Sequence, residues 1–144
     1  MPKKIIGRID KGDFPTLDLE DIDIKIDTGA YTSSMHCHKV VEEDNVLKCL
    51  FFDKEHPNYN KKIIVFKNYT TTKVKSSNGI VQNRYMVKTT INLFDKKYKI
   101  HLTLSTRSEM KYPLLIGRKF LSKKFVVDIN SKNLSYKKKL TKQA

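Results

Sequence analysis

The segment Ile24-Lys25-Ile26-Asp27-Thr28-Gly29-Ala30 decides the fold of this chain, because it places an acid between an apolar strand and a glycine turn. Ile22, Ile24 and Ile26 alternate with polar residues, and this period of two is typical of a strand with one buried face. Asp27 follows where that strand ends. The segment predicts a rigidly held carboxylate that is open to a ligand. An Asp in this position is also a common turn former that bonds nearby backbone amides, which is the alternative interpretation of Asp27 taken alone.

Two further motifs follow in a fixed order. Ser76-Ser77-Asn78-Gly79 contains Asn-Gly, which predicts a tight hairpin because both residues tolerate positive φ. We expect this hairpin to span residues 69–90. Tyr112-Pro113-Leu114-Leu115-Ile116-Gly117-Arg118 then gives a second apolar strand that ends in Gly-Arg. Residues 118–124 are the one segment with a helical pattern, and we expect a short helix there.

The rest of the chain alternates between apolar and polar residues, which predicts strands joined by turns. The further strands are expected at residues 4–9, 46–52, 61–66, 69–75, 80–90, 98–104, 114–116 and 125–128. So many short strands in 144 residues predict a single all-β domain over residues 1–136, closed into a β-barrel. Residues 137–144 are rich in lysine, and we expect a flexible basic tail there.

The ordered set of motifs resembles the retropepsin-like aspartic proteases, whose pattern is Asp-Thr-Gly-Ala after an apolar strand, a glycine-tipped hairpin flap, and an apolar Gly-Arg strand before a helix. Residues 27–36, 74–79 and 115–118 are most similar to a bacterial family labelled ATP-dependent zinc proteases. This similarity covers nearly the whole chain. It implies the closed barrel of the acid proteases and an aspartic endopeptidase activity.

The resemblance makes Asp27 the single catalytic carboxylate of each chain. Aspartic protease chemistry needs two carboxylates that share a proton, one to accept a proton from water and one to donate to the scissile carbonyl. The chain has one Asp-Thr-Gly, so an active enzyme is expected to be a homodimer with paired Asp27 side chains.

The other roles also follow from the resemblance. Thr28 would hydrogen-bond across the dimer, Gly29 and Ala30 would complete the active-site turn, and Gly29 would expose backbone to a substrate strand. Ser77, Asn78 and Gly79 would form the tip of the flap. Arg118 would brace the catalytic turn. Viral retropepsins carry an acid directly after Asp-Thr-Gly-Ala, whereas this chain carries Tyr31, so Arg118 needs another partner.

The sequence contains neither a His-Glu-x-x-His motif nor a Gly-x-x-x-x-Gly-Lys phosphate loop. We therefore expect no cofactor and no catalytic metal. The candidate metal ligands are His36 and His38, which would share a face if they lay on a regular strand, with Cys49 or His56 to complete a site. A metallopeptidase is the corresponding alternative, and it requires stoichiometric zinc.

Charge is distributed unevenly along the chain. Residues 1–56 contain 8 Lys/Arg and 12 Asp/Glu, whereas residues 57–144 contain 21 and 3. The basic part favours an acidic partner, and members of the resembled family accompany enzymes that append glutamates to a ribosomal protein. We expect an acidic or glutamate-rich peptide substrate. A solubilising lysine-rich surface is the alternative interpretation of the charge.

A non-catalytic basic module that binds nucleic acid or another polyanion is the second functional hypothesis. Tyr69, Tyr85, Tyr98 and Phe94 would stack on bases, although they suit a core or cross-strand pairs equally well.

Two cysteines are too few for a disulfide framework, and the start of the sequence lacks a secretory signal pattern. We expect a cytoplasmic protein that does not enter a membrane.

Overall fold

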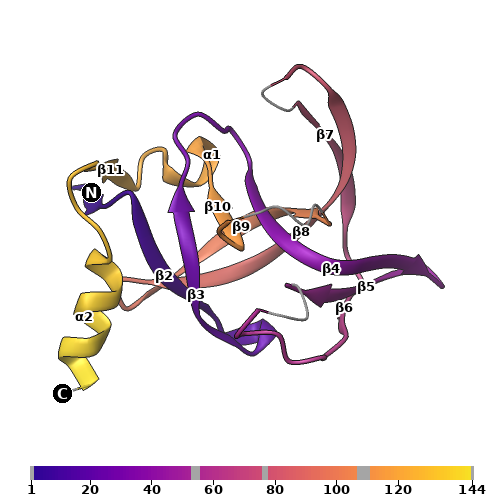
Figure 1. The fold of residues 1–144 in the computed structure, drawn as a ribbon, viewed down its shortest axis with the longest axis horizontal. Coiled ribbons are helices and arrows are strands. Elements are labelled where there is room, and N and C mark those ends of the chain that lie inside the picture. Colours follow the sequence, from indigo (N-terminus) through magenta and orange to yellow (C-terminus); the bar gives the residue numbers. More distant parts are fainter. Residues whose placement is uncertain (1, 53–55, 76–77, 107–110, 144) are drawn as a thin grey trace.

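The computed structural model describes residues 2–52, 56–75, 78–106 and 111–143, and its strands and helices are shown in Figure 1. The strands are β1 (Lys4–Ile6), β2 (Ile9–Phe14), β3 (Leu19–Ile26), β4 (Ser33–Glu43), β5 (Val46–Phe51), β6 (Ile64–Phe66), β7 (Thr70–Lys75), β8 (Val81–Leu93), β9 (Lys96–Ser105), β10 (Leu114–Ile116) and β11 (Phe125–Val127). The helices are α1 (Arg118–Leu121), α2 (Leu134–Gln143) and a 3-10 turn at Pro15–Leu17. The prediction of a mostly β chain is confirmed.

Strand pairing forms a ring. The order of hydrogen-bonded neighbours is β10, β3, β2, β8, β9 and β4, and β4 pairs back to β10. β5 and β6 continue from β4, and β7 pairs with β8. β1 and β11 form a separate parallel pair. A ring of this kind is consistent with the predicted closed barrel, which stays a prediction.

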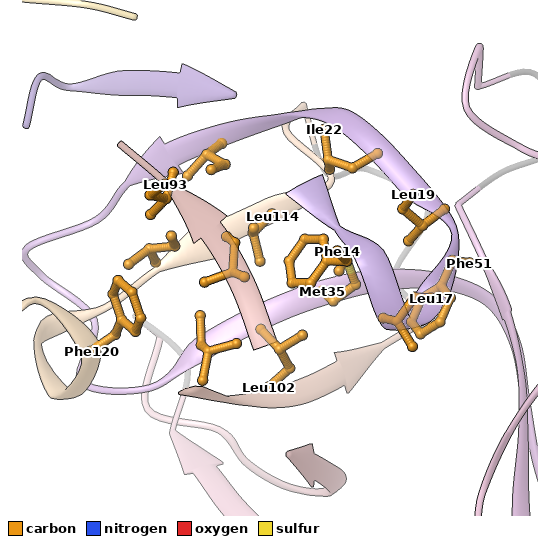
Figure 2. Packing of buried hydrophobic residues seen from close by; sticks show 14 of the residues in the cluster. Phe14, Leu17, Leu19, Ile22, Met35, Phe51, Leu93, Leu102, Leu114 and Phe120 are labelled. Carbon is orange, nitrogen blue, oxygen red and sulfur yellow. The ribbon is translucent and has the colours of Figure 1, made fainter. Parts of the chain in front are cut away.

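The core lies between the strands of this ring. The isoleucines of β3 that face it are Ile22, Ile24 and Ile26, and all are buried, as their alternation predicts. Figure 2 shows that apolar side chains from several strands and from α1 point toward one another; those it labels are Phe14, Leu17, Leu19, Ile22, Met35, Phe51, Leu93, Leu102, Leu114 and Phe120. Burial of this apolar surface is the main force that holds the strands in place.

Several predicted boundaries are wrong. The prediction of one strand over residues 4–9 is wrong because β1 ends at Ile6 and β2 begins at Ile9. The long strand β4 is absent from the predicted strands. The helix after the Gly-Arg strand is confirmed, but it ends at Leu121 instead of Lys124.

Among the described residues, no helix has both the length and the apolar character that a bilayer span requires.

Residues 137–143, for which the sequence predicts a flexible basic tail, lie in α2. The carboxylate of Asp10 on β2, only 2% exposed, accepts backbone hydrogen bonds from Ser135 (2.9 Å) and Tyr136 (3.1 Å) at the start of this helix. Burial raises the pKa of Asp10, and these amide bonds oppose the rise. Asp10 therefore caps a helix that lies far away in the sequence.

Lys139 fixes the middle of α2. Its ammonium group lies 3.0 Å from a carboxylate oxygen of Asp13, 3.1 Å from Glu20 and 2.7 Å from Asp21. Desolvation lowers the pKa of Lys139, but hydrogen bonds to the carboxylates, led by Asp21, raise it overall. The lysine therefore offsets part of the negative charge of this acidic cluster on β2 and β3 and ties the helix to it.

Replacing Asp10 with Ala is expected to lower the free energy of unfolding by about 1–3 kcal/mol, because two helix amides and a buried site lose their acceptor. Urea unfolding measures the loss, and the far-ultraviolet circular dichroism signal reports helix content. Glu43→Ala, which removes an exposed carboxylate paired with Lys48, is the matched control. Equal midpoints for the two variants would contradict the capping role.

Candidate active site around Asp27

The two motif strands are neighbours in the structure. β3 and β10 run parallel, with Ile26 opposite Ile116, and the amide of Asp27 donates to the carbonyl of Ile116 at 2.8 Å. Figure 1 shows β3 ending close to β10 and α1. The fold therefore brings together the acid and the Gly-Arg segment that the sequence separates.

The Asp27 carboxylate is held by its own turn. The amide of Gly29 donates to Asp27 Oδ1 at 3.1 Å, and the amide of Ala30 donates to the Asp27 carbonyl at 3.2 Å. Among the described residues, no group of this chain hydrogen-bonds to Oδ2 of Asp27. Asp27 is half-buried, while Thr28 and Gly29 are exposed. One carboxylate oxygen is thus oriented by the turn and the other is available to a ligand.

Arg118 contacts this turn at three points. Its Nη1 donates to the Thr28 carbonyl at 2.9 Å, and its amide donates to the Ala30 carbonyl at 2.9 Å. Its guanidinium also lies over the ring of Tyr31, 5.9 Å from the centroid. A backbone carbonyl and an aromatic face therefore take the place of the acid that viral retropepsins carry after Asp-Thr-Gly-Ala.

Gly117 permits this close packing, a role that the sequence analysis missed. A Cβ atom at this position would lie 2.6 Å from the carbonyl oxygen of Thr32 and 2.8 Å from those of Ala30 and Tyr31. The Gly117 amide donates to Ser33 Oγ at 3.1 Å. A glycine directly after an apolar strand was a visible hint of close packing. The sequence does not show which segment of the backbone packs against that glycine.

The predicted hairpin is present. β7 and β8 pair in register from Thr70 opposite Met86 to Lys75 opposite Val81, and Figure 1 shows them extending away from the rest of the sheet. Gly79 has φ +85°, a conformation that favours glycine. Ser77, assigned to the flap, lies outside the described residues. Ile80 and Val81 beside the tip are 56% and 54% exposed, so the tip carries apolar surface.

The predicted metal ligands are not gathered on one face. The register of β4 against β5 shifts between Cys37 and Lys39, and this irregularity leaves His36 buried and His38 exposed. Burial raises the pKa of the Cys49 thiol to about 12. Among the described residues, the one group with metal-ligand spacing consists of Asp13, Glu20 and Asp21, which contact Lys139.

The aromatic residues assigned to base stacking pack against other rings of the protein. Tyr69 contacts Tyr85 with centroids 5.9 Å apart. Tyr98 and Phe94 contact Phe125 at 5.5 and 6.0 Å. These contacts match the alternative interpretation, in which the aromatics form cross-strand pairs and part of the core.

The chain is similar to part of several longer proteins. It is 32% identical over 130 residues to a protein of Shewanella halifaxensis named "Probable alpha-L-glutamate ligase", and 29% identical over 131 residues to a protein of the same name from Parasynechococcus marenigrum. Each match covers 88% of this chain but 28% of the relative.

The fold also has a match among solved structures. The crystal structure of protein Lpg0085 from Legionella pneumophila, described as having unknown function, superimposes with a TM-score of 0.71 at 26% identity. The match covers 93% of this chain and 99% of that protein. A family profile described as "Retropepsin-like aspartic endopeptidase RimB" matches residues 5–138. This chain therefore belongs to the RimB-like family of retropepsin-like proteins.

Proposed function

We propose that this protein is a homodimeric aspartic endopeptidase to which each chain contributes one Asp27. The observation that supports this most directly is the Asp27 turn, which orients one carboxylate oxygen and leaves Thr28 and Gly29 exposed beside it. Exposed turn residues are available for contact with a second copy of the chain. Under this proposal, the ring of strands closes into the barrel of the acid proteases.

The proposed chemistry uses two Asp27 carboxylates that share one proton, because two like charges held close together do not both ionise. The ionised carboxylate accepts a proton from water as the water oxygen attacks the scissile carbonyl carbon. The protonated carboxyl donates to the carbonyl oxygen. In the second step the C–N bond breaks and the leaving nitrogen takes a proton from the pair.

The β7–β8 hairpin would cover the substrate. Its tip at Asn78 and Gly79 would close over an extended peptide and exclude water, as active-site flaps do. The exposed side chains of Ile80 and Val81 would then be buried against the peptide or the second chain. Hydrolysis that requires Asp27 tests the proposal: Asp27→Asn is expected to lower kcat/KM for peptide hydrolysis by about 10²- to 10⁴-fold.

An acidic, glutamate-rich peptide is the substrate that we propose. The hairpin carries Lys73, Lys75 and Arg84, and Arg84 lines a hollow of about 640 Å³ between β8 and the end of β9. Relatives named as glutamate ligases support the same substrate class. Guanidinium and ammonium groups near the flap would attract carboxylates to the cleft.

We expect a peptide with a run of glutamates to be cleaved with a higher kcat/KM than its glutamine counterpart. This advantage should shrink as ionic strength rises from about 0.05 M to about 0.5 M, because salt screens exposed charges. Steady-state kinetics with both peptides measure the effect. Equal cleavage of the two peptides, with no salt dependence, would contradict the substrate class while leaving the role of Asp27 open to its own test.

A further inference from the structure

A basic surface surrounds α1 and adjoins the Asp27 turn through Arg118 and Tyr31. We call it the α1 basic surface and define it by Tyr31, Lys99, Arg118, Lys119, Lys123 and Lys124. It contains two adjoining hollows: one of about 150 Å³ at Lys99, His101 and Lys119, and one of about 690 Å³ at Tyr31, Arg118 and Lys123. Lys119 and Lys124 line both hollows. The surface is therefore continuous and concave.

The cations of this surface are not neutralised. In the part of the chain that the structure describes, no Asp or Glu lines either hollow. The α2 side is different, because Lys139 and Lys142 form ion pairs with carboxylates. Lys119 Nζ lies 3.3 Å from Nδ1 of His101. The pKa of His101 is lowered, mainly because the imidazole is desolvated and also because Lys119 and Lys88 carry positive charges nearby. The local potential is positive and suits a bound anion.

Tyr31 adds an aromatic platform to this charge. Its side chain is 58% exposed, and the Arg118 guanidinium lies over its ring. An exposed aromatic face beside cations is how proteins hold single-stranded nucleic acid: bases stack on the ring and phosphates contact lysine and arginine.

An extended peptide has less to bind here. Peptides commonly add to an open strand edge through backbone hydrogen bonds. The residues that line the larger hollow belong to the Asp27 turn, to α1 and to the residues directly after α1, and none of them lies in a strand. At this hollow the surface thus offers charge and an aromatic ring without a strand edge, which favours a nucleic acid over a strand-forming peptide.

We propose that the α1 basic surface binds single-stranded nucleic acid, with Lys119, Lys123 and Lys124 contacting phosphates and Tyr31 stacking on a base. The proposed contacts do not include the Asp27 carboxylate, so binding does not depend on peptidase activity. The Asp27→Asn variant is therefore expected to bind as the wild type does, so that failure of the peptidase proposal and failure of this one are distinguishable.

The test is fluorescence anisotropy with a labelled single-stranded oligouridine of about 12 nucleotides, a length typical of such sites. The triple variant Lys119→Gln, Lys123→Gln, Lys124→Gln is expected to weaken binding at least about 10-fold. It should also lower the slope of log K against log salt by about 0.7 for each lost phosphate contact. The matched control replaces Lys96, Lys97 and Lys138 with Gln. This control removes the same charge from a hollow beside α2 that these three lysines line, and it should weaken binding much less.

Tyr31 gives a second, independent readout. Tyr31→Ala is expected to weaken binding about 5- to 100-fold through loss of stacking, and Tyr31→Phe is expected to retain it. Equal losses in the two triple-lysine variants, or unchanged binding by Tyr31→Ala, would overturn the proposal. So would displacement of the RNA by an oligoglutamate peptide that binds the same surface more tightly, because that result would assign the site to an acidic polypeptide. Thermal melting of each variant checks that it is folded.

Discussion

Replacing Asp27 with Asn is expected to lower kcat/KM for peptide hydrolysis by about 10²- to 10⁴-fold, the contribution typical of positioned acid–base groups. An amide at this position neither accepts a proton from water nor shares one with a partner carboxylate. The amide oxygen of Asn still accepts the bond that Gly29 donates to Asp27 Oδ1, so the turn should keep its shape. Peptide cleavage assays and thermal melting, performed on the same preparation, separate activity from folding.

The control for this variant is Asp23→Asn on β3, the strand that precedes Asp27. Asp23 is partly exposed and pairs with Lys11 at 2.9 Å. Loss of this ion pair should lower the free energy of unfolding by at most about 1 kcal/mol and leave hydrolysis unchanged. A fully active Asp27→Asn protein would refute the proposed mechanism.

Mixing wild type with an equal amount of Asp27→Asn adds a test of the dimer. After the subunits exchange, activity per wild-type chain should fall to about half, because a mixed dimer holds only one of the two Asp27 carboxylates.

Replacing Gly117 with Ala is expected to lower the free energy of unfolding by about 3 kcal/mol and to reduce activity as well. The new methyl group would lie under 3 Å from the carbonyl oxygens of Thr32, Ala30 and Tyr31. These are backbone atoms, so relief requires movement of the turn that holds Asp27 and contacts Arg118. Urea unfolding gives the stability change, and kcat/KM reports the effect on the site.

Gly29→Ala is the matched control within the same turn. A Cβ atom at this position would approach only Asp27 Oδ1, at an ordinary contact distance of 3.4 Å. Its stability should stay within about 1 kcal/mol of the wild type. If Gly117→Ala lowered the free energy of unfolding as little as Gly29→Ala does, the surrounding chain would be able to relieve the crowding at Gly117, and the prediction would be wrong.

Much of the site could be predicted because the sequence patterns that indicate it are local. The alternation of Ile22, Ile24 and Ile26 predicts a strand with one buried face, and the strand then ends at Asp27. Asn78-Gly79 predicts the hairpin because glycine accepts positive φ at low cost. In both cases a short run of residues carries its own conformational preference, which the fold does not reverse.

The strand β4 shows where such signals fail. Ser33, Ser34 and His36 are polar yet buried, so the segment has no alternation that predicts a strand. Its place depends on pairing with β5, β9 and β10. Backbone hydrogen bonds to three partners stabilise it, and none of these partners is apparent from the segment itself.

The sequence by itself determined the mostly β fold, the hairpin and the turn at Asp27, because each depends on a local pattern of apolar residues, glycine or asparagine. Only the tertiary structure decided that the lysine-rich end of the chain is a helix. An isolated helix of this length is marginal in water, and α2 is held by Asp10 and by the bonds of Lys139 to Asp13 and Asp21. Those carboxylates lie more than a hundred residues away along the chain, and folding brings them together.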